Sequence, residues 1–338
     1  MSDVLTHGEL HGATESNVIL DVQDLKVHFP VYGGLLQREV GTVKAVDSVS
    51  FQVHEGETLG LVGESGCGKS TTGLAILRML PTTSGRIVFE GVDITNYNRN
   101  QMRPIRRRIQ MVYQDPFGSL DPRMTIGGII GEPLEIHKLH GKGVERRARV
   151  MELIEMVGLR HDMIDRYPHQ FSGGQRQRIG IARALAVEPR LLICDEPVSA
   201  LDVSIQAQVV NLFQELQDRL GISLIFVAHD LAVVRHVSQR IAVMYLGTIV
   251  EISTRDELYA NPKHPYTKAL MLAIPVPNPI VEAGRRHQTI QGEVPSAERP
   301  PPGCRFHPRC PHAMPVCKEK TPKLLPEGDG MVACHLFT

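Results

Sequence analysis

The sequence has little of several features that mark common classes of protein. It contains no tryptophan and only 5% aromatic residues, too few for the stacking platforms that single-stranded nucleic acid needs. Lysine plus arginine and aspartate plus glutamate both total 37, so no overall charge favours nucleic acid or an acidic membrane surface. The basic stretches at residues 103–108 and 145–150 are interpreted as solvated faces. We therefore expect no nucleic-acid partner.

Long apolar runs and an export signal are missing as well. Apolar runs such as Ile222 to Ala228 fall far short of the ~20 residues that a membrane helix needs. Residues 1–17 are polar and acidic, without the basic start and apolar core of a secretory signal, which predicts a disordered tail. We expect a cytoplasmic protein whose membrane role can only be peripheral.

Cysteine is scarce along the chain except at its end. If the six cysteines were spread evenly, the last 35 residues would contain about 0.6 of a cysteine. Fourteen of the 23 prolines fall within residues 262–326, and proline at that density opposes helices and central strands. Residues 254–338 are therefore expected to be a loop-rich extension held together by something other than regular structure. Four of the six cysteines lie in the last 35 residues: Cys304, Cys310, Cys317 and Cys334.

These four cysteines allow several interpretations. Stable disulfides are unfavourable in a reducing cytosol, and unrelated packing thiols are a further alternative. A metal bound by the four thiolates would close loops of five, six and sixteen residues. Zinc is a common guest, but its structural sites usually include ligand pairs two to four residues apart; wider spacings suit a 4Fe–4S cluster. His307, His312 and His335 are expected to lie around such a site or at the surface.

The chain between its two ends alternates short β-branched runs with longer helical periods, which predicts an α/β core over residues 18–253. Strand patterns disappear between Ile126 and Val187, where helical patterns dominate. A helical subdomain is therefore expected at about residues 115–187, inserted into the core. Strands are predicted at residues 18–29, 58–63, 108–113, 190–197, 223–230 and 240–252.

Residues 63–71 read GESGCGKST and lie between an apolar run and a helical one. They fit the phosphate-loop pattern G-x-x-x-x-G-K-S/T in the strand and helix context that the pattern requires. The glycines let backbone N–H groups curve around phosphate oxygens, and the helix N-terminus adds its positive end. Lys69 would supply a charge to the outer phosphates, and Ser70 a hydroxyl to Mg²⁺. The predicted nucleotide-binding residues of the loop are Gly63, Ser65, Gly66, Cys67, Gly68, Lys69, Ser70 and Thr71.

A second motif, LLICDEP, ends an apolar strand pattern in two carboxylates, Asp195 and Glu196. Burying two acids at a strand end is costly unless a cation meets them. Asp195 is therefore expected to bind Mg²⁺, and Glu196 is the candidate to polarise an attacking water.

The stretch FSGGQRQR, residues 171–178, resembles the signature motif of ATP-binding-cassette (ABC) ATPases, and the match covers about residues 18–253. The resemblance implies ATP and Mg²⁺ as cofactors and a role for three further residues. Phe29 would stack on adenine, Gln114 in YQDP would contact Mg²⁺ and water, and His229 in VAHD would hold the γ-phosphate. Phe171 stands where the family usually has leucine. The signature together with SALD excludes a plain kinase or GTPase.

The same resemblance implies that two cassettes pack head to tail. Each signature would meet the ATP bound by the partner's phosphate loop, so that ATP closes the dimer and hydrolysis reopens it. Ser199 and Asp202, in SALD, would couple the two interfaces. The signature residues implied to reach the partner's ATP are Ser172, Gly173, Gly174 and Gln175.

Residues 264–279 and 292–317 resemble the C-terminal extension of ATPase subunits of dipeptide and oligopeptide importers, most closely the "F-type" subunit. This resemblance implies a second, unlike ATPase subunit, two membrane permease subunits, and indirectly a peptide-binding protein, at the cytoplasmic face of the inner membrane. A permease helix would dock near Gln114 and Phe117. Members of this group carry a 4Fe–4S cluster in the extension, which favours iron over zinc at the four cysteines.

Two other functions remain open from the sequence. Importers of nickel, glutathione or an opine share these extensions, because other subunits choose the solute. A soluble cassette ATPase of translation or DNA repair usually carries tandem cassettes or long coiled-coil insertions, and this sequence shows neither.

Overall fold

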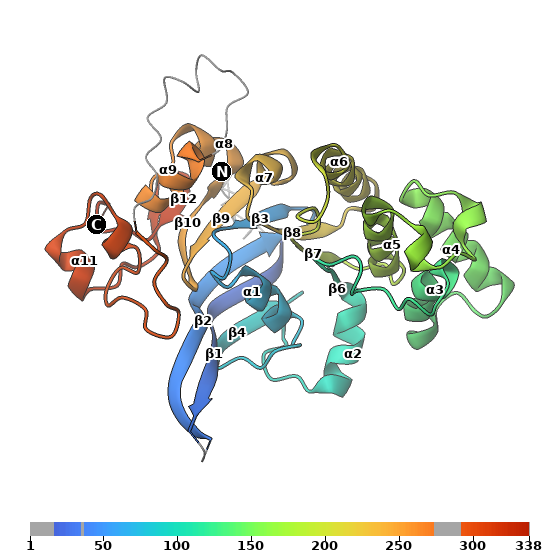
Figure 1. The fold of residues 1–338 in the computed structure, drawn as a ribbon, viewed down its shortest axis with the longest axis horizontal. Coiled ribbons are helices and arrows are strands. Elements are labelled where there is room, and N and C mark those ends of the chain that lie inside the picture. Colours follow the sequence, from blue (N-terminus) through green and yellow to red (C-terminus); the bar gives the residue numbers. More distant parts are fainter. Residues whose placement is uncertain (1–16, 35–36, 274–291, 338) are drawn as a thin grey trace, which may run out of the picture.

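A computed structural model describes residues 17–34, 37–273 and 292–337 of the chain, as two sheets with helices around them (Figure 1). The tail predicted at residues 1–17 lies outside the described residues, except for its last one. The helices are α1 (Lys69–Ile76), α2 (Arg99–Arg108), α3 (Ile126–Ile136), α4 (Val144–Met156), α5 (Gly173–Leu185), α6 (Val203–Leu220), α7 (Leu231–Val237), α8 (Arg255–Ala260), α9 (Pro265–Leu272) and α11 (Pro315–Glu319). Short 3₁₀ turns occur at His161–Met163, Pro168–Gln170 and His307–Arg309.

The larger sheet has eight strands in the order β11-β12-β10-β9-β3-β8-β7-β6. Neighbours β9, β3, β8, β7 and β6 run parallel, so their carboxyl ends meet at one edge. Every residue of β3, β7 and β8 is buried, as expected for central parallel strands covered on both faces. The strands are β3 (Thr58–Val62), β6 (Ile109–Val112), β7 (Leu191–Asp195), β8 (Ser223–Ala228), β9 (Arg240–Tyr245), β10 (Thr248–Thr254), β11 (Leu325–Glu327) and β12 (Gly330–Val332).

The smaller sheet is antiparallel, in the order β2-β1-β4-β5. Its long pair β1 and β2 extends below the larger sheet in Figure 1. Its buried residues share one core with α1 and with one face of the larger sheet. Its strands are β1 (Val18–Gly33), β2 (Arg38–His54), β4 (Ser84–Phe89) and β5 (Val92–Asp93).

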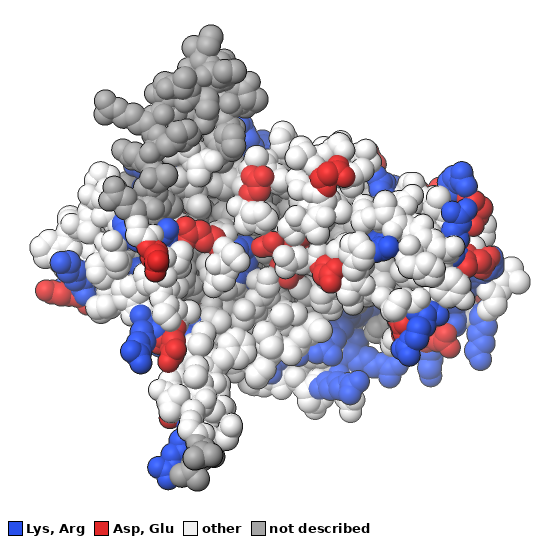
Figure 2. Space-filling view, in the orientation of Figure 1, with Lys and Arg blue, Asp and Glu red and all other residues white. Residues whose placement is uncertain are grey.

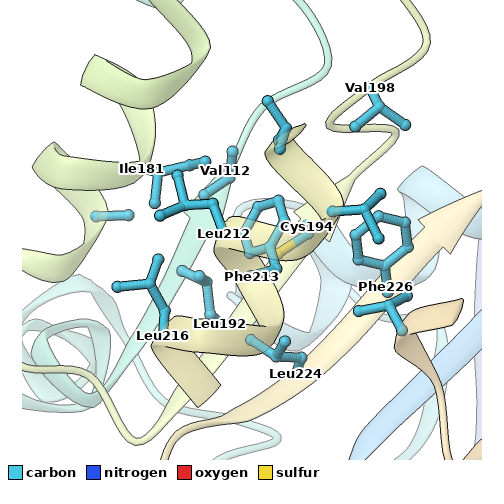
Figure 3. Packing of buried hydrophobic residues seen from close by; sticks show 14 of the residues in the cluster. Val112, Ile181, Leu192, Cys194, Val198, Leu212, Phe213, Leu216, Leu224 and Phe226 are labelled. Atoms are coloured by element: carbon cyan, nitrogen blue, oxygen red, sulfur yellow. The ribbon is translucent and has the colours of Figure 1, made fainter. Parts of the chain in front are cut away.

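A second core lies on the other face of the larger sheet, where α6 covers β7 and β8 (Figure 3). Phe213 of α6 meets Phe226 of β8 edge to face, with ring centroids 5.7 Å apart. Asp202 caps the start of α6, and Gly221 ends it with a left-handed backbone conformation (φ 64°). Because Asp202 is the last residue of the motif SALD, α6 begins directly after this motif.

Helices α3, α4 and α5 pack against one another at the end of the molecule near β6 (Figure 1). This group confirms that helices replace strands between Ile126 and Val187.

The exposed arginines of α2 lie where Figure 2 shows a band of positive charge. In the described parts of the chain, no helix is long and apolar enough to cross a membrane.

The expectation that the proline-rich end is held without regular structure is wrong in part. Helices α8 and α9 follow β10, and β12 pairs antiparallel with β10, so the C-terminal extension adds two strands to the larger sheet. Pro326 lies in β11, which is the outermost strand of the sheet. Proline is tolerated there because an edge strand has ladder positions that need no N–H donor.

Candidate active site at the carboxyl edge of the parallel strands

Residues 63–68 form the turn between β3 and α1, at the carboxyl edge of the larger sheet. Its three glycines have positive φ angles of 155°, 78° and 106°. A Cβ atom at Gly63 would lie 2.1 Å from the carbonyl oxygen of Met244, and one at Gly68 would lie 2.2 Å from that of Ala45. Only glycine fits these two positions, because the loop passes close to β9 and β2.

Lys69 begins α1 and turns its side chain back over the loop. Its Nζ donates hydrogen bonds to the carbonyl oxygens of Gly63 (2.8 Å) and Glu64 (3.0 Å). The residue is only 4% exposed, and an ammonium buried to that degree requires acceptors. Phosphate oxygens at the same loop would be stronger acceptors than carbonyls because they carry charge.

Ser70 and Asp195 join the phosphate loop to the end of β7. The Ser70 Oγ donates to Asp195 Oδ1 at 2.7 Å. Burial raises the pKa of Asp195, and the neighbouring Glu196 raises it further, against the lowering effect of the Ser70 hydrogen bond and of Lys69. Hydroxyl and carboxylate oxygens are the ligands that Mg²⁺ prefers, so this pair fits the ion that the sequence predicts.

Glu196 is the centre of a second cluster. Its Oε2 accepts a hydrogen bond from Gln114 Nε2 at 3.2 Å and lies 3.3 Å from His229 Nδ1. The three residues follow β6, β7 and β8, neighbouring parallel strands whose carboxyl ends meet. The backbone of Glu196 is in the left-handed region (φ 42°), which is uncommon for a residue other than glycine and recurs at functional sites. The sequence predicted each residue alone, and the structure brings all three together.

Ser199 and Asp202 lie between this cluster and α6. Ser199 donates from its Oγ to the Glu196 carbonyl oxygen at 3.0 Å, and so supports the unusual backbone there. Asp202 caps α6 and is exposed. Its hydrogen bonds from the Ser204 hydroxyl and the Ile205 amide hold the pKa of Asp202 below its ordinary value.

The signature begins α5. Ser172 Oγ accepts from the Gln175 amide at 3.4 Å, and Gln175 Oε1 accepts from the Ser172 amide at 3.1 Å. This capping box leaves the first helical amides, those of Gly173 and Gly174, directed out of the helix end, where anions bind. Across the described residues, no hydrogen bond joins the signature to the phosphate loop. The structure therefore does not bring these two predicted motifs together within one chain.

Phe29, the predicted adenine-stacking residue, lies on β1. It is half-buried and packs against the core shared by the smaller sheet and α1. This core also contains Cys67 of the phosphate loop, so Phe29 packs against the same cluster as the loop, and its contact with adenine stays a prediction.

Two residues that the sequence did not single out contact the phosphate loop from the C-terminal extension. Tyr266 of α9 accepts a hydrogen bond at its Oη from the Glu64 amide, 3.0 Å away. Arg309 donates to both carboxylate oxygens of Glu64, at 2.9 and 3.1 Å. Both residues lie in the stretches that resemble peptide-importer subunits. Nothing in the sequence, however, predicted that they contact the phosphate loop.

The four clustered cysteines are free thiols. Burial raises the pKa of Cys304 to about 11, and the nearby thiols of Cys317, Cys334 and Cys310 raise it as well. The backbone N–H of Cys304 donates to the Cys317 carbonyl oxygen at 2.8 Å, which ties the two segments. The thiols thus gather in one region. Within the described residues, however, no three His, Cys, Asp or Glu side chains are arranged to share a metal ion.

A hollow of about 810 Å³ opens beside Gln114. Tyr113, Glu132 and Arg183 line it together with Gln114, so it lies between α3, α5 and the end of β6. Phe117, in the loop that follows, is 60% exposed, and the guanidinium carbon of Arg176 lies 3.9 Å from its ring centroid.

Comparison with known proteins agrees with this geometry. Residues 46–199 match the family model "ABC transporter", and residues 250–317 match "Oligopeptide/dipeptide transporter, C-terminal region". A solved structure of the ATP-binding cassette MJ0796, a dimer in a post-hydrolysis state bound to ADP and Pi, is similar with a TM-score of 0.62 and 28% identity. The match covers 70% of this chain and 98% of that one.

Curated relatives are similar over nearly the whole chain. The oligopeptide transport ATP-binding protein AppF of Bacillus subtilis is 52% identical over 328 residues, which cover 96% of this chain and 99% of the relative. The oligopeptide transport ATP-binding protein OppF of Salmonella typhimurium is 54% identical over 314 residues, 92% of this chain and 93% of the relative. The chain therefore belongs to the ABC transporter family, as an ATP-binding subunit of the oligopeptide and dipeptide transporter group.

Proposed function

We propose that this chain hydrolyses ATP to power the uptake of dipeptides and oligopeptides through a membrane importer. The observation that carries the chemistry is Glu196, whose carboxylate is held by Gln114 and His229 beside the Ser70–Asp195 pair. The peptide-transporter region at residues 250–317 and the AppF and OppF relatives support the transport role. The protein would act at the cytoplasmic face of the inner membrane.

In this proposal the loop at residues 63–71 binds the triphosphate through its amides and Lys69. Ser70, Asp195 and Gln114 would hold Mg²⁺, which neutralises phosphate charge when bound. Glu196 takes a proton from the attacking water while the water oxygen bonds to the γ-phosphorus and ADP leaves. His229 orients the Glu196 carboxylate and faces the γ-phosphate.

The site is completed by a second cassette. Among the described residues, no hydrogen bond joins the start of α5 to the chain's own phosphate loop, which supports the use of its amides by the phosphate bound in a partner. The similar cassette MJ0796 is a dimer. We infer a partner ATPase subunit that differs from this chain, with two permease subunits above the pair and a peptide-binding protein outside. A permease helix would enter the hollow beside Gln114, near Phe117.

Residues 18–253 would form the nucleotide-binding domain, with its helical subdomain at about residues 115–187, and residues 254–338 the extension. We further propose that Cys304, Cys310, Cys317 and Cys334 hold a 4Fe–4S cluster, with zinc as the alternative. Support comes from the gathering of the four thiols and from their spacing. Anaerobically purified protein should then contain iron and sulfide and absorb broadly in the visible range. Colourless protein with one bound zinc would overturn the choice of metal.

The transport proposal is tested by reconstituting the importer in vesicles with and without this chain. ATP hydrolysis by the purified chain alone should be slow, and it should rise at least tenfold with the partner subunit and permeases because each site borrows the partner's α5. Uptake of labelled peptide should require the chain. Equal hydrolysis by the isolated chain and the full complex would overturn the paired-subunit proposal.

A further inference from the structure

The C-terminal extension contacts the phosphate loop through an ion pair as well as through Tyr266. Arg309 and Glu64 lie 245 positions apart, and the two terminal guanidinium nitrogens of Arg309, Nη1 and Nη2, donate to the Glu64 carboxylate. Arg309 also donates to Tyr245 Oη at 3.3 Å. The Arg309 side chain is only 7% exposed and that of Glu64 25% exposed, so solvent screens this pair less than it screens a surface pair.

Glu64 is negatively charged and lies in a loop that would bind negatively charged phosphates. It is the second residue of the loop that we assign to the triphosphate, and its carbonyl oxygen already accepts from Lys69 Nζ. A carboxylate there would repel the phosphates and weaken their attraction to Lys69. A bidentate ion pair with arginine neutralises a carboxylate more effectively than a single hydrogen bond does.

The segment that carries Arg309 is itself fixed to the cassette. Phe306 packs against both Tyr245 and Tyr266, with ring centroids 5.2 and 5.4 Å away, and these two tyrosine rings also contact each other. Arg305 forms an ion pair with Asp47 and donates to the Leu246 carbonyl oxygen. Docking of residues 305–309 therefore places the Arg309 guanidinium against the phosphate loop.

We propose that Arg309 is a positioning residue for nucleotide binding that acts through Glu64: by neutralising this carboxylate, the extension sets the affinity of the phosphate loop for ATP. The proposal rests on the assignment of residues 63–71 to ATP binding. It gives the extension a role in the nucleotide site of its own chain, in addition to any metal it holds.

The first test compares ATP binding by Arg309→Gln and unaltered protein, by titration with a fluorescent ATP analogue and Mg²⁺. Affinity should fall about five- to tenfold because the Glu64 charge is exposed to the phosphates. The loss should shrink at high salt, where that repulsion is screened. Arg305→Gln is the matched control, since it removes a similarly buried arginine of the same segment, one whose partners Asp47 and Leu246 lie outside the loop. An equal loss in the control would show that only docking of the extension matters.

The decisive test is rescue. In the double variant Arg309→Gln with Glu64→Gln the repelling carboxylate is gone, so most of the lost affinity should return. If Arg309 only stabilised the fold, the second substitution would restore nothing, and that result would overturn the proposal. Should Arg309→Gln alone fail to fold, Glu64→Gln alone decides: it leaves a positive charge facing the phosphates and should tighten ATP binding, whereas weaker binding contradicts the inference.

Lys69→Ala separates this inference from the proposed function. Loss of ATP binding in Lys69→Ala together with normal binding in Arg309→Gln would reject the role of Arg309 alone. Normal binding in Lys69→Ala would reject the assignment of the phosphate loop, and the inference with it.

Discussion

Glu196 has two hydrogen-bonding neighbours on one carboxylate oxygen, and its replacement should separate binding from hydrolysis. Glu196→Gln keeps the size and the contacts with Gln114 and His229 but loses the charge that attracts a proton from water. We expect turnover in the assembled complex to fall at least about a hundredfold. ATP affinity should stay within about twofold, because Lys69 and the loop amides are intact. Phosphate release and ATP titration measure the two quantities.

A suitable control is Glu155→Gln, an exposed glutamate of α4 whose side chain is 76% exposed. It should hydrolyse ATP at the normal rate. Retained turnover in Glu196→Gln would remove this residue from the role of base and leave His229 as the candidate.

His264 makes the stability of the extension depend on pH. It is 1% exposed and caps α9, accepting at Nδ1 from the Tyr266 amide, and burial lowers the pKa of His264 to about 3. Between this value and the unfolded value of about 6.5, the unfolded chain binds a proton that the folded chain does not. The free energy of unfolding therefore falls as the pH falls below 6.5.

Because of this histidine, the free energy of unfolding should be about 1 kcal/mol lower at pH 5.5 than at pH 7.5. His264→Asn keeps an acceptor for the Tyr266 amide but cannot take up a proton, so its urea midpoint should fall less over this range. Glu251, which accepts from the Lys263 and His264 amides, is present in both proteins and cancels in the comparison. Parallel curves for the two proteins would contradict the prediction.

At the scale of elements, two glycines of α5 differ in their surroundings and should respond oppositely to alanine. A Cβ at Gly174 would lie 2.4 Å from Ile205 Cγ2 of α6, whereas one at Gly180 would meet no atom within 4 Å. Gly174→Ala should lower the free energy of unfolding by about 1–3 kcal/mol, because α5 and α6 must move apart. Gly180→Ala should raise it by up to about 1 kcal/mol, because alanine favours a helix. Urea denaturation measures both, and equal effects would contradict the packing.

The elements also show what sequence alone can predict. Strands β7 and β8 and helix α5 follow from local patterns, since an unbroken apolar run and a Ser172 cap need no knowledge of distant residues. Glu196 could be predicted as a candidate because it ends a recognised strand, whereas Gln114 and His229 were implied by the family resemblance. That the three side chains meet follows from the order of β6, β7 and β8 in the sheet. Strands β11 and β12 could not be predicted, because three-residue strands have no periodicity and exist only through pairing with β10.

The contact between Arg309 and Glu64 was missed for a similar reason. Neither residue has a local pattern that specifies a partner, and only the docking of residues 305–309 on the cassette brings them together. The gathering of the thiols, in contrast, agrees with their clustering in sequence, although the described side chains do not form a metal site.

At the scale of the whole molecule, the shared sheet predicts that cassette and extension unfold together. Strand β12 pairs with β10, and the Ala333 amide donates to the Val250 carbonyl oxygen at 2.8 Å. Pulse-labelling hydrogen exchange in increasing urea should show segments 223–228 and 330–333 losing protection at the same concentration. Earlier loss in 330–333 would mean that the extension is a separate unit.

Pro326 has a consequence for how whole chains meet one another. The outermost strand on its side of the sheet is only three residues long, and its central residue lacks an N–H donor. A strand from another molecule cannot continue the hydrogen-bond ladder across such a border, and Glu327 beside it adds a charge. The extension therefore closes this side of the sheet against edge-to-edge aggregation.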